Sequence, residues 1–279
     1  MPPANVTTIE RRLHDWASRS ANERHYEKSQ VQLIEAALAD RRRTTQLATG
    51  AYLLGTWHLA SGQSAVLRGD MDAWSDIRIG ASLQRTSMLL RSRTRRRQTR
   101  HGEQPDLPTL QAANCVAMSL ALDDPGAEPL YETFRTLPNS AFHETSAYPL
   151  FVKAVLMLRA NQRPTLNRAL GSYGEIIRHW NGEAELLARR LAELLDIHLG
   201  QTQSRPGHPA DFGERGVQLF PLEVLMVKQV RATMEEPMPK VEHPLMFTNL
   251  ATTHPRGPWP SLGLLEQLER RLAPLLRRN

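Results

Sequence analysis

The sequence has one cysteine and few lysines. Because Cys115 is the only cysteine among the 279 residues, the chain can form neither an intrachain disulfide nor a metal site built from several cysteines. Its position in the apolar run AANCVAMSLAL favours a buried structural thiol over a reactive one. Only four of the 35 basic residues are lysine. The net charge of +6 would suit a nucleic-acid partner, but the arginines are spread over most predicted helices, which is more typical of a solvated surface.

Long apolar runs are also missing. No segment approaches the roughly 18–20 apolar residues that a membrane-spanning helix needs, so we expect no membrane association. The N-terminal segment MPPANVTTIERRLHDW has no apolar core that could act as a secretion signal. The sequence therefore predicts a cytoplasmic protein.

Motifs of catalysis, cofactor binding and metal binding are absent as well. The sequence has no GxxxxGK[ST], no GxGxxG after a predicted strand and no GxSxG. Its ten histidines form no HExxH motif and no pair spaced four residues apart. His179 and His198 lie on predicted helices, where we expect them at the edge of the core rather than in a metal site. We predict no catalytic residues, no cofactor and no metal, and thus no enzyme.

Helical periodicity is the main feature of the chain, and it is clearest in residues 50–97. This stretch predicts a helix over 50–61, closed by Gly62, and a longer helix that is capped by Asp70 and ends in a run of arginines. Small residues alternate there with large apolar ones, a pattern typical of two closely packed helices. The small residues are Gly50, Gly55, Ala60, Gly80 and Ala81.

Apolar stripes at helical spacing predict further helices. One begins at a cap on Thr7 or Thr8, and a second runs from about 22 to 43. The others cover residues 109–122, 128–137, 144–161, 165–180, 183–199, 220–236 and 262–277. Residues 237–260 contain six prolines and cannot be a regular helix. VQLF and KVEHP are the only short strand candidates.

The predicted fold class is therefore all-α. We expect antiparallel helical hairpins packed as one multi-helix domain, with a proline-rich loop before the last helix. The domain covers residues 1–279, and a subdivision into 1–104 and 105–279 stays open.

Six arginines lie between residues 91 and 100, and three interpretations of them stay open. They form the solvated end of a helix, a contact surface for an acidic protein, or a nucleic-acid contact. No aromatic residues are interleaved for base stacking, which argues against nucleic acid. As a protein-binding surface, the candidate residues are Arg93, Arg95, Arg96 and Arg97.

Trp259 differs from the other tryptophans because it lies between prolines, in HPRGPWPS, and not on an apolar helix face. It either packs back over the core as a lid or anchors a partner protein. Trp and Arg dominate protein interfaces, so Arg256 and Trp259 join the candidate partner-binding residues.

Three segments resemble a known family. The C-terminal segment FPLEVLMVKQVRATMEEPMPKVEHPLMFTNLA is similar to the C-terminal pattern of the bacterial immunity protein 49 family. AYLLGTWHLASG and DAWSDIRIGASLQ are similar to that family's helical hairpin. The resemblance implies an all-helical protein that neutralises a cognate bacterial toxin by direct stoichiometric binding, with no catalytic residues. The matching motif residues are read as scaffold: Pro221, Glu223, His243, Pro244, Leu245 and Met246.

Two physical expectations accompany this resemblance. A cytoplasmic inhibitor guards only against a toxin that acts in the cytoplasm. A net charge of +6 favours an acidic or neutral toxin, because complementary charge speeds association. The alternatives are a helical adaptor or regulatory protein-binding module unrelated to toxins, and an arginine-rich nucleic-acid binder.

Overall fold

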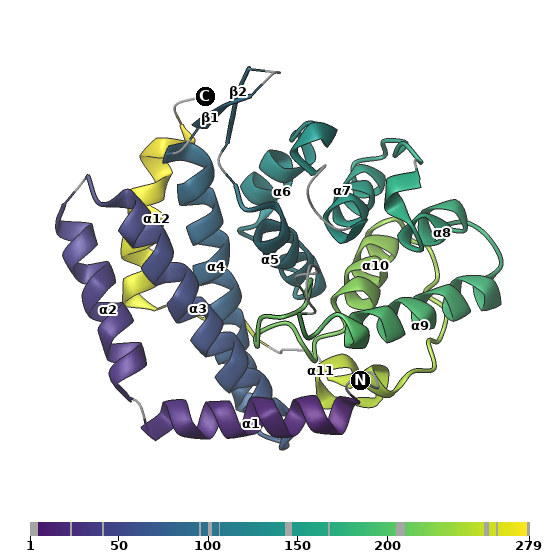
Figure 1. Cartoon of the computed structure of the whole chain (residues 1–279), viewed down its shortest axis with the longest axis horizontal. Coiled ribbons are helices and arrows are strands. Elements are labelled where there is room, and N and C mark those ends of the chain that lie inside the picture. Colours follow the sequence, from purple (N-terminus) through teal and green to yellow (C-terminus); the bar gives the residue numbers. More distant parts are fainter. Residues whose placement is uncertain are drawn as a thin grey trace.

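Two long antiparallel helices, α3 (Thr44–Leu67) and α4 (Trp74–Thr94), form the centre of the computed structural model (Figure 1). The structure describes residues 5–277 except 23, 41, 95, 100–101, 106, 143–146, 167, 205–209, 254–256 and 261. In these residues twelve α-helices are joined by short 3-10 turns and one small β-hairpin. The all-α prediction is confirmed.

The other elements follow in chain order. The α-helices are α1 (Val6–Asn22), α2 (Arg24–Ala39), α5 (Thr109–Ala121), α6 (Glu128–Arg135), α7 (Ala147–Arg159), α8 (Tyr173–Arg178), α9 (Ala184–Gly200), α10 (Leu222–Thr233), α11 (Asn249–Thr252) and α12 (Gly263–Leu276). The 3-10 turns are η1 (Met71–Ala73), η2 (Asn139–Phe142), η3 (Arg168–Leu170) and η4 (Pro244–Phe247). The strands β1 (Arg96–Thr99) and β2 (Gly102–Pro105) pair antiparallel.

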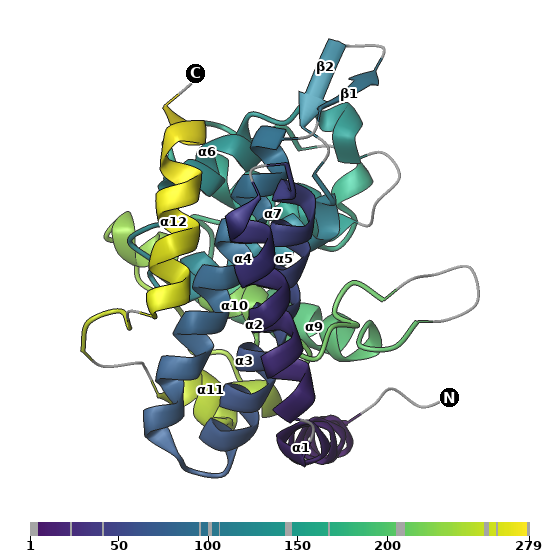
Figure 2. The same ribbon diagram turned by 90° about the vertical axis from the view of Figure 1, so that its left-hand side faces the viewer.

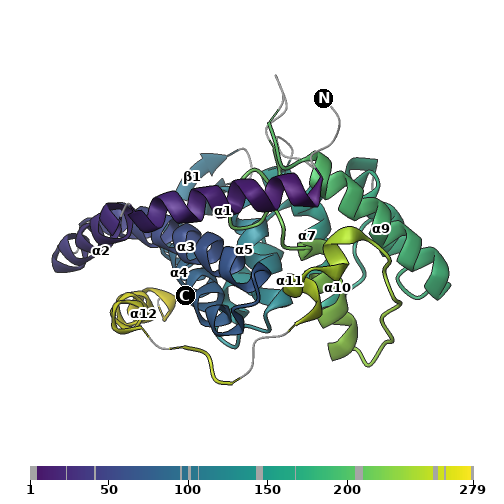
Figure 3. The same ribbon diagram turned by 90° about the horizontal axis from the view of Figure 1, so that it is seen from below.

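The remaining helices pack around the α3–α4 pair. Helix α2 contacts α3, α12 contacts α4, and α1 crosses the end of the pair. Figure 2 shows α12 running along α4, and Figure 3 places α1 and α12 on opposite sides of the pair. On the other side of α4 lies α5, which in turn contacts α6, α7 and α10. One hydrophobic core runs through these layers, from Ile9 to Leu272.

Helices α3 and α4 touch through glycines, as the small-residue pattern predicts. A Cβ atom added to Gly55 would lie 2.8 Å from the carbonyl oxygen of Gly80. A Cβ atom added to Gly80 would lie 2.7 Å from the carbonyl oxygen of Gly55. Because both neighbours are backbone atoms, neither position has room for a side chain.

The prediction that the first of these helices ends at Gly62 was wrong. Helix α3 continues to Leu67, and Gly62 is buried where a Cβ atom would come within 2.9 Å of Ile77. The turn glycine is Gly69, whose φ of +96° favours glycine. Asp70 then caps η1 by accepting a hydrogen bond from the backbone N–H of Asp72, as predicted.

Three further sequence predictions need correction. The helix expected over 165–180 is only η3 and α8, separated by Gly171 at a φ of +52°. Neither VQLF nor KVEHP is a strand; the β-hairpin lies at 96–105, inside the arginine run. Helix α1 is capped by Asn5, which accepts a hydrogen bond from the Thr8 backbone N–H at 2.8 Å, and not by Thr7 or Thr8.

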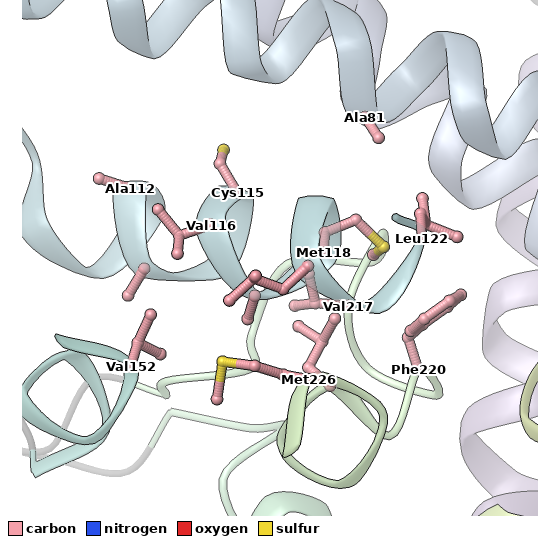
Figure 4. Close-up of a cluster of buried hydrophobic side chains, with 14 of the residues drawn as sticks. Ala81, Ala112, Cys115, Val116, Met118, Leu122, Val152, Val217, Phe220 and Met226 are labelled. Atoms are coloured by element: carbon pink, nitrogen blue, oxygen red, sulfur yellow. The ribbon is translucent and has the colours of Figure 1, made fainter. Parts of the chain in front are cut away.

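Helix α5 contacts α4, α6, α7 and α10, and Figure 4 shows buried side chains of this part of the core. All residues from Ala112 to Leu120 are buried. Val116 faces Val152 of α7 and Met226 of α10 in the close-up. Cys115 is 2% exposed, and burial raises the pKa of its thiol well above the usual value. This agrees with the predicted structural role of the lone cysteine.

An irregular segment, residues 211–220, passes through the middle of the fold. Polar side chains from three helices hold its backbone: Asn114 donates to the Asp211 carbonyl at 3.3 Å, Gln63 donates to the Gly216 carbonyl, and His198 contacts the Gln218 carbonyl. Buried backbone groups that lack regular secondary structure need such partners. The segment thereby ties α3 and α5 to α9.

Candidate protein-binding surface

The structure describes four of the six residues predicted to bind a partner. Arg95 and Arg256 lie outside the described residues. Arg93 is in the last turn of α4 and is half-buried. Arg96 and Arg97 belong to β1. The arginine run is therefore divided between a helix end and a hairpin, and it is not one helical face.

Trp259 packs back over α4 and rests on Arg78. The Arg78 guanidinium lies 5.3 Å from the centre of the Trp259 ring, within the range of a cation–π contact. The Nη1 atom of Arg78 also donates to the carbonyl oxygens of Gly257 at 2.9 Å and Pro258 at 3.1 Å. We call residues 257–260 the strap. The lid interpretation of Trp259 agrees with this packing, while the half-buried ring still reaches the surface.

Local chemistry explains the path of the strap. Gly257 has a φ of +80°, which a residue with a side chain rarely adopts. Pro258 and Pro260 restrict the backbone on both sides of Trp259. At the start of the connection, the Trp74 indole N–H donates to the Thr253 hydroxyl at 3.0 Å. Helix α4 therefore holds the connection through two side chains one turn apart, Trp74 and Arg78.

A cavity opens on each side of the strap. The first, of about 500 Å³, lies between α4, α5, α10 and the strap. The second, of about 730 Å³, lies between η1, the start of α4, the end of α11 and the strap. Arg78 lines both. The strap thus divides one groove along α4 into two halves.

Both halves have charged and apolar residues in their walls. Arg78, Lys228 and Asp123 line the first together with Trp259. Asp123 has a φ of +54°, a strained backbone that persists only where its surroundings hold it. Burial lowers the pKa of Arg78 from its usual value, although its guanidinium remains charged at neutral pH. In the second half, Asp72 and Arg78 lie beside Met71, Trp74 and two prolines.

Exposed apolar side chains gather at the same end of α3. Met71 is 39% exposed and lines the second cavity. Phe247 is 61% exposed, the largest value among the large apolar residues that the structure describes. It lies two residues before Asn249, whose side chain donates to the Val66 carbonyl near the end of α3 at 3.0 Å. The strap surface, as we name it, comprises five residues that line the two cavities: Met71, Arg78, Asp123, Lys228 and Trp259.

The structure does not bring the two groups of predicted residues together. Arg78, beneath Trp259, and Arg93 are fifteen positions apart on one helix, which corresponds to roughly 22 Å along its axis. The strap surface and the arginine run therefore lie at opposite ends of α4. Sequence reasoning missed Arg78, although its position four residues after Trp74 on the same helix face was a usable signal.

Four of the six motif residues of the C-terminal segment are buried, whereas Pro244 is exposed and Met246 is half-buried. Glu223 and Leu245 are fully buried, and His243 is 6% exposed. His243 caps η4 by accepting a hydrogen bond from the Leu245 backbone N–H at 3.2 Å. Glu223 contacts His198, which is completely buried rather than at the core edge where the sequence placed it. The buried motif residues therefore pack and hydrogen-bond within the fold.

No helix in the described parts of the chain is long and apolar enough to cross a membrane. Among the same residues, no three His, Cys, Asp or Glu side chains come together as metal ligands would. Comparisons of the chain with protein families, with characterised proteins and with solved structures find no match.

Proposed function

We propose that this chain is an immunity protein that binds a cognate bacterial toxin in the cytoplasm and neutralises it as a stoichiometric complex through the strap surface. The observation that carries the proposal is Trp259, held on Arg78 between two open cavities. The resemblance of the C-terminal and hairpin segments to the immunity protein 49 family supports the same function.

The strap surface has the composition of an interface centre. Trp and Arg side chains carry much of the binding energy in protein complexes, especially when pockets surround them. Here two hydrogen bonds and a cation–π contact already fix both residues. A preorganised anchor loses little conformational entropy on binding. Met71, which lines the second cavity together with Arg78, adds exposed apolar area next to it.

Charge favours an acidic or neutral partner. The whole chain carries a net charge of +6. The lining of the first cavity contains two cations, Arg78 and Lys228, and one carboxylate, Asp123. Opposite charge on the toxin would speed association and fix its orientation. We therefore expect carboxylates of the toxin at the α10 side of the strap and apolar side chains at the Met71 side.

The buried titratable groups support binding rather than catalysis. Cys115, His198 and Glu223 contact other protein groups inside the core, whereas a nucleophile or general base must reach its substrate. The charged groups of the strap surface are Arg78, Lys228 and Asp123, a set better suited to recognition than to proton transfer at neutral pH.

Co-expression with the toxin encoded beside this chain's gene tests the function. We expect the chain to restore growth and to co-purify with the toxin in a 1:1 complex. Growth that stays inhibited despite normal expression of the chain would contradict an immunity function. A stable complex with an unrelated protein, in the absence of any effect on toxicity, would favour the helical adaptor instead.

Paired tryptophan variants test the surface. Trp259→Ala should weaken toxin binding by at least about 2 kcal/mol, or roughly 30-fold. Trp16→Ala is the matched control, because Trp16 is also half-buried and has an arginine, Arg215, 5.0 Å from its ring centre. It belongs to α1, across the α3–α4 pair from α12 (Figure 3). Wild-type affinity in Trp259→Ala, measured by calorimetry, would show that the toxin binds elsewhere.

A further inference from the structure

A second cleft, remote from the strap, lies between the end of α6, helix α7 and residues 162–165. Its volume is about 250 Å³. Apolar side chains, among them Leu150, Met157 and Leu170, line part of it. The polar part of the wall consists of Arg135, Asn139, Lys153, Gln162 and Thr165.

The two carboxamides of this cleft are turned so that their oxygens are already used. The Asn139 Oδ1 atom accepts a hydrogen bond from Lys153 Nζ at 2.9 Å. The Gln162 Oε1 atom accepts one from Arg135 Nη1 at 2.7 Å. What remains on each amide is its NH₂ group, which only donates. The polar wall therefore offers donors from two cations and two amides.

Positive charge in the cleft is only partly compensated. Arg135 also pairs, through Nη2, with Glu132 at 2.5 Å. Lys153 has no carboxylate within ion-pair distance in the described part of the chain; its ammonium donates to Asn139 and to the Leu137 carbonyl. Hydrogen bonds use two of the three donors of the ammonium, which also lies 5.5 Å from the centre of the Phe142 ring. No acidic residue belongs to the described lining.

Burial acts on the same ammonium. The pKa of Lys153 is lowered from its usual value because the group is partly removed from water. A bound anion would stabilise the charged form and reverse this shift. The cleft thus has the charge, the donors and the partial desolvation of an oxyanion site.

We propose that the α6–α7 cleft binds a small amphipathic oxyanion, a carboxylate or phosphate group attached to a short apolar body. The anionic group would contact Lys153 and Arg135 and accept from the amides of Asn139 and Gln162. The apolar body would lie against Leu150 and Met157. The volume is below the 300–1,000 Å³ typical of drug-sized sites, so the ligand has the size of a small metabolite. This proposal does not depend on the toxin-binding function.

Calorimetric titration of the full chain with four probes tests the proposal. Benzoate and phenyl phosphate carry the anion and the apolar body, inorganic phosphate carries only the anion, and benzamide is a neutral match in shape. We expect one equivalent of benzoate or phenyl phosphate to bind more tightly than inorganic phosphate, and benzamide not to bind. The tighter of the two anionic probes tells whether the natural headgroup is a carboxylate or a phosphate.

Charge-removing variants then locate the site. Arg135→Gln and Lys153→Gln should each weaken binding of the better probe by roughly tenfold to a hundredfold, the effect of one charge-assisted hydrogen bond. Arg178→Gln is the control, since Arg178 also pairs with a glutamate three residues before it but does not line the cleft. If Lys153→Gln does not fold, the affinity of Arg135→Gln for the probe still tests whether the anion binds in this cleft.

Several results would overturn the proposal. These are the absence of binding by both organic anions, equal affinity for benzamide and benzoate, and an Arg178→Gln loss as large as the Arg135→Gln loss. Inorganic phosphate binding as tightly as phenyl phosphate would overturn the apolar half of the proposal.

Discussion

His198 and Glu223 pair inside the core, where the His198 Nδ1 atom lies 2.9 Å from Glu223 Oε2 and neither side chain is exposed. On the other side of the ring, Nε2 lies 3.1 Å from the Gln218 carbonyl, which only accepts hydrogen bonds. The Nε2–H therefore donates to this carbonyl, while Nδ1 faces the carboxylate. The pair joins α9, α10 and the irregular segment 211–220.

Breaking this pair should be costly, because either partner left alone is a buried polar group without its main contact. We expect His198→Leu and Glu223→Leu each to lower the free energy of unfolding by about 3–5 kcal/mol. The double variant should lose roughly 0.5–3 kcal/mol less unfolding free energy than the two single variants lose together. Urea unfolding of the four proteins measures this cycle. Strictly additive losses would show that the two side chains do not interact.

Stability should depend on pH through His243. Burial lowers its pKa below the ordinary value of about 6.5, and the neighbouring Asp196 opposes the shift only in part. The unfolded chain therefore takes up this proton at a higher pH than the folded chain. The contribution of neutral His243 to the free energy of unfolding is complete above about pH 6.5. It is lost as the pH falls from there through the pKa that His243 has in the folded chain.

An asparagine at position 243 tests this pH dependence. His243→Asn keeps an acceptor for the Leu245 N–H, which His243 now caps, but it does not titrate. Between pH 7 and pH 5, the free energy of unfolding should fall less steeply with pH in the variant than in the wild type. The difference in slope should be up to about 1.4 kcal/mol per pH unit. Parallel curves for the two proteins would assign the acid sensitivity to other groups.

The crossing of α3 and α4 should tolerate no side chain at Gly80. A Cβ atom there would lie 2.7 Å from both the Gly55 carbonyl oxygen and the Leu59 backbone nitrogen. We expect Gly80→Ala to lower the free energy of unfolding by about 1–3 kcal/mol, although alanine has the better helix propensity. Gly200→Ala at the end of α9 has open space and should be neutral or slightly stabilising. Equal stability of the two variants would contradict the close crossing.

Arg85 contacts two carboxylates whose contributions to the free energy of unfolding should differ greatly. Its Nη1 atom donates to Asp124, whose side chain is 1% exposed, and its Nη2 atom lies 2.7 Å from Glu269 of α12, whose side chain is 46% exposed. We expect Asp124→Asn to cost about 3 kcal/mol or more, as for other buried pairs. Glu269→Gln should cost no more than about 1 kcal/mol. Thermal unfolding ranks the two, and a reversed order would contradict the assigned burial.

Much of the helical fold was predictable because its signals are local. Leucines at helical spacing identify α9, and Asp70 next to a periodic run identifies the start of η1 and α4. Small residues that alternate with large apolar ones predicted the close α3–α4 pair. The errors arose where one residue type serves two purposes. Gly62 resembles a helix end but provides close packing, and Gly171 divides a stretch that is periodic enough to look continuous.

The candidate site was only half predictable. The sequence identified Trp259 as a candidate because the prolines around it are incompatible with a helix. It did not identify Arg78, which contacts Trp259 in the structure. The two cavities depend on how η1, α4, α5, α10 and α11 lie relative to the strap. The same holds for the α6–α7 cleft, whose donors come from two helices and two connecting segments.

The sequence by itself determined the helical class, the closely packed central hairpin and the burial of Cys115, because periodicity, capping and apolar runs act over a few neighbouring residues. Only the tertiary structure decided which charged side chains meet. The Arg85–Glu269 contact joins residues 184 positions apart, and the Arg78–Gly257 contact joins residues 179 apart. Such contacts depend on the angles and offsets at which helices pack, and these follow from the side chains of the whole core together.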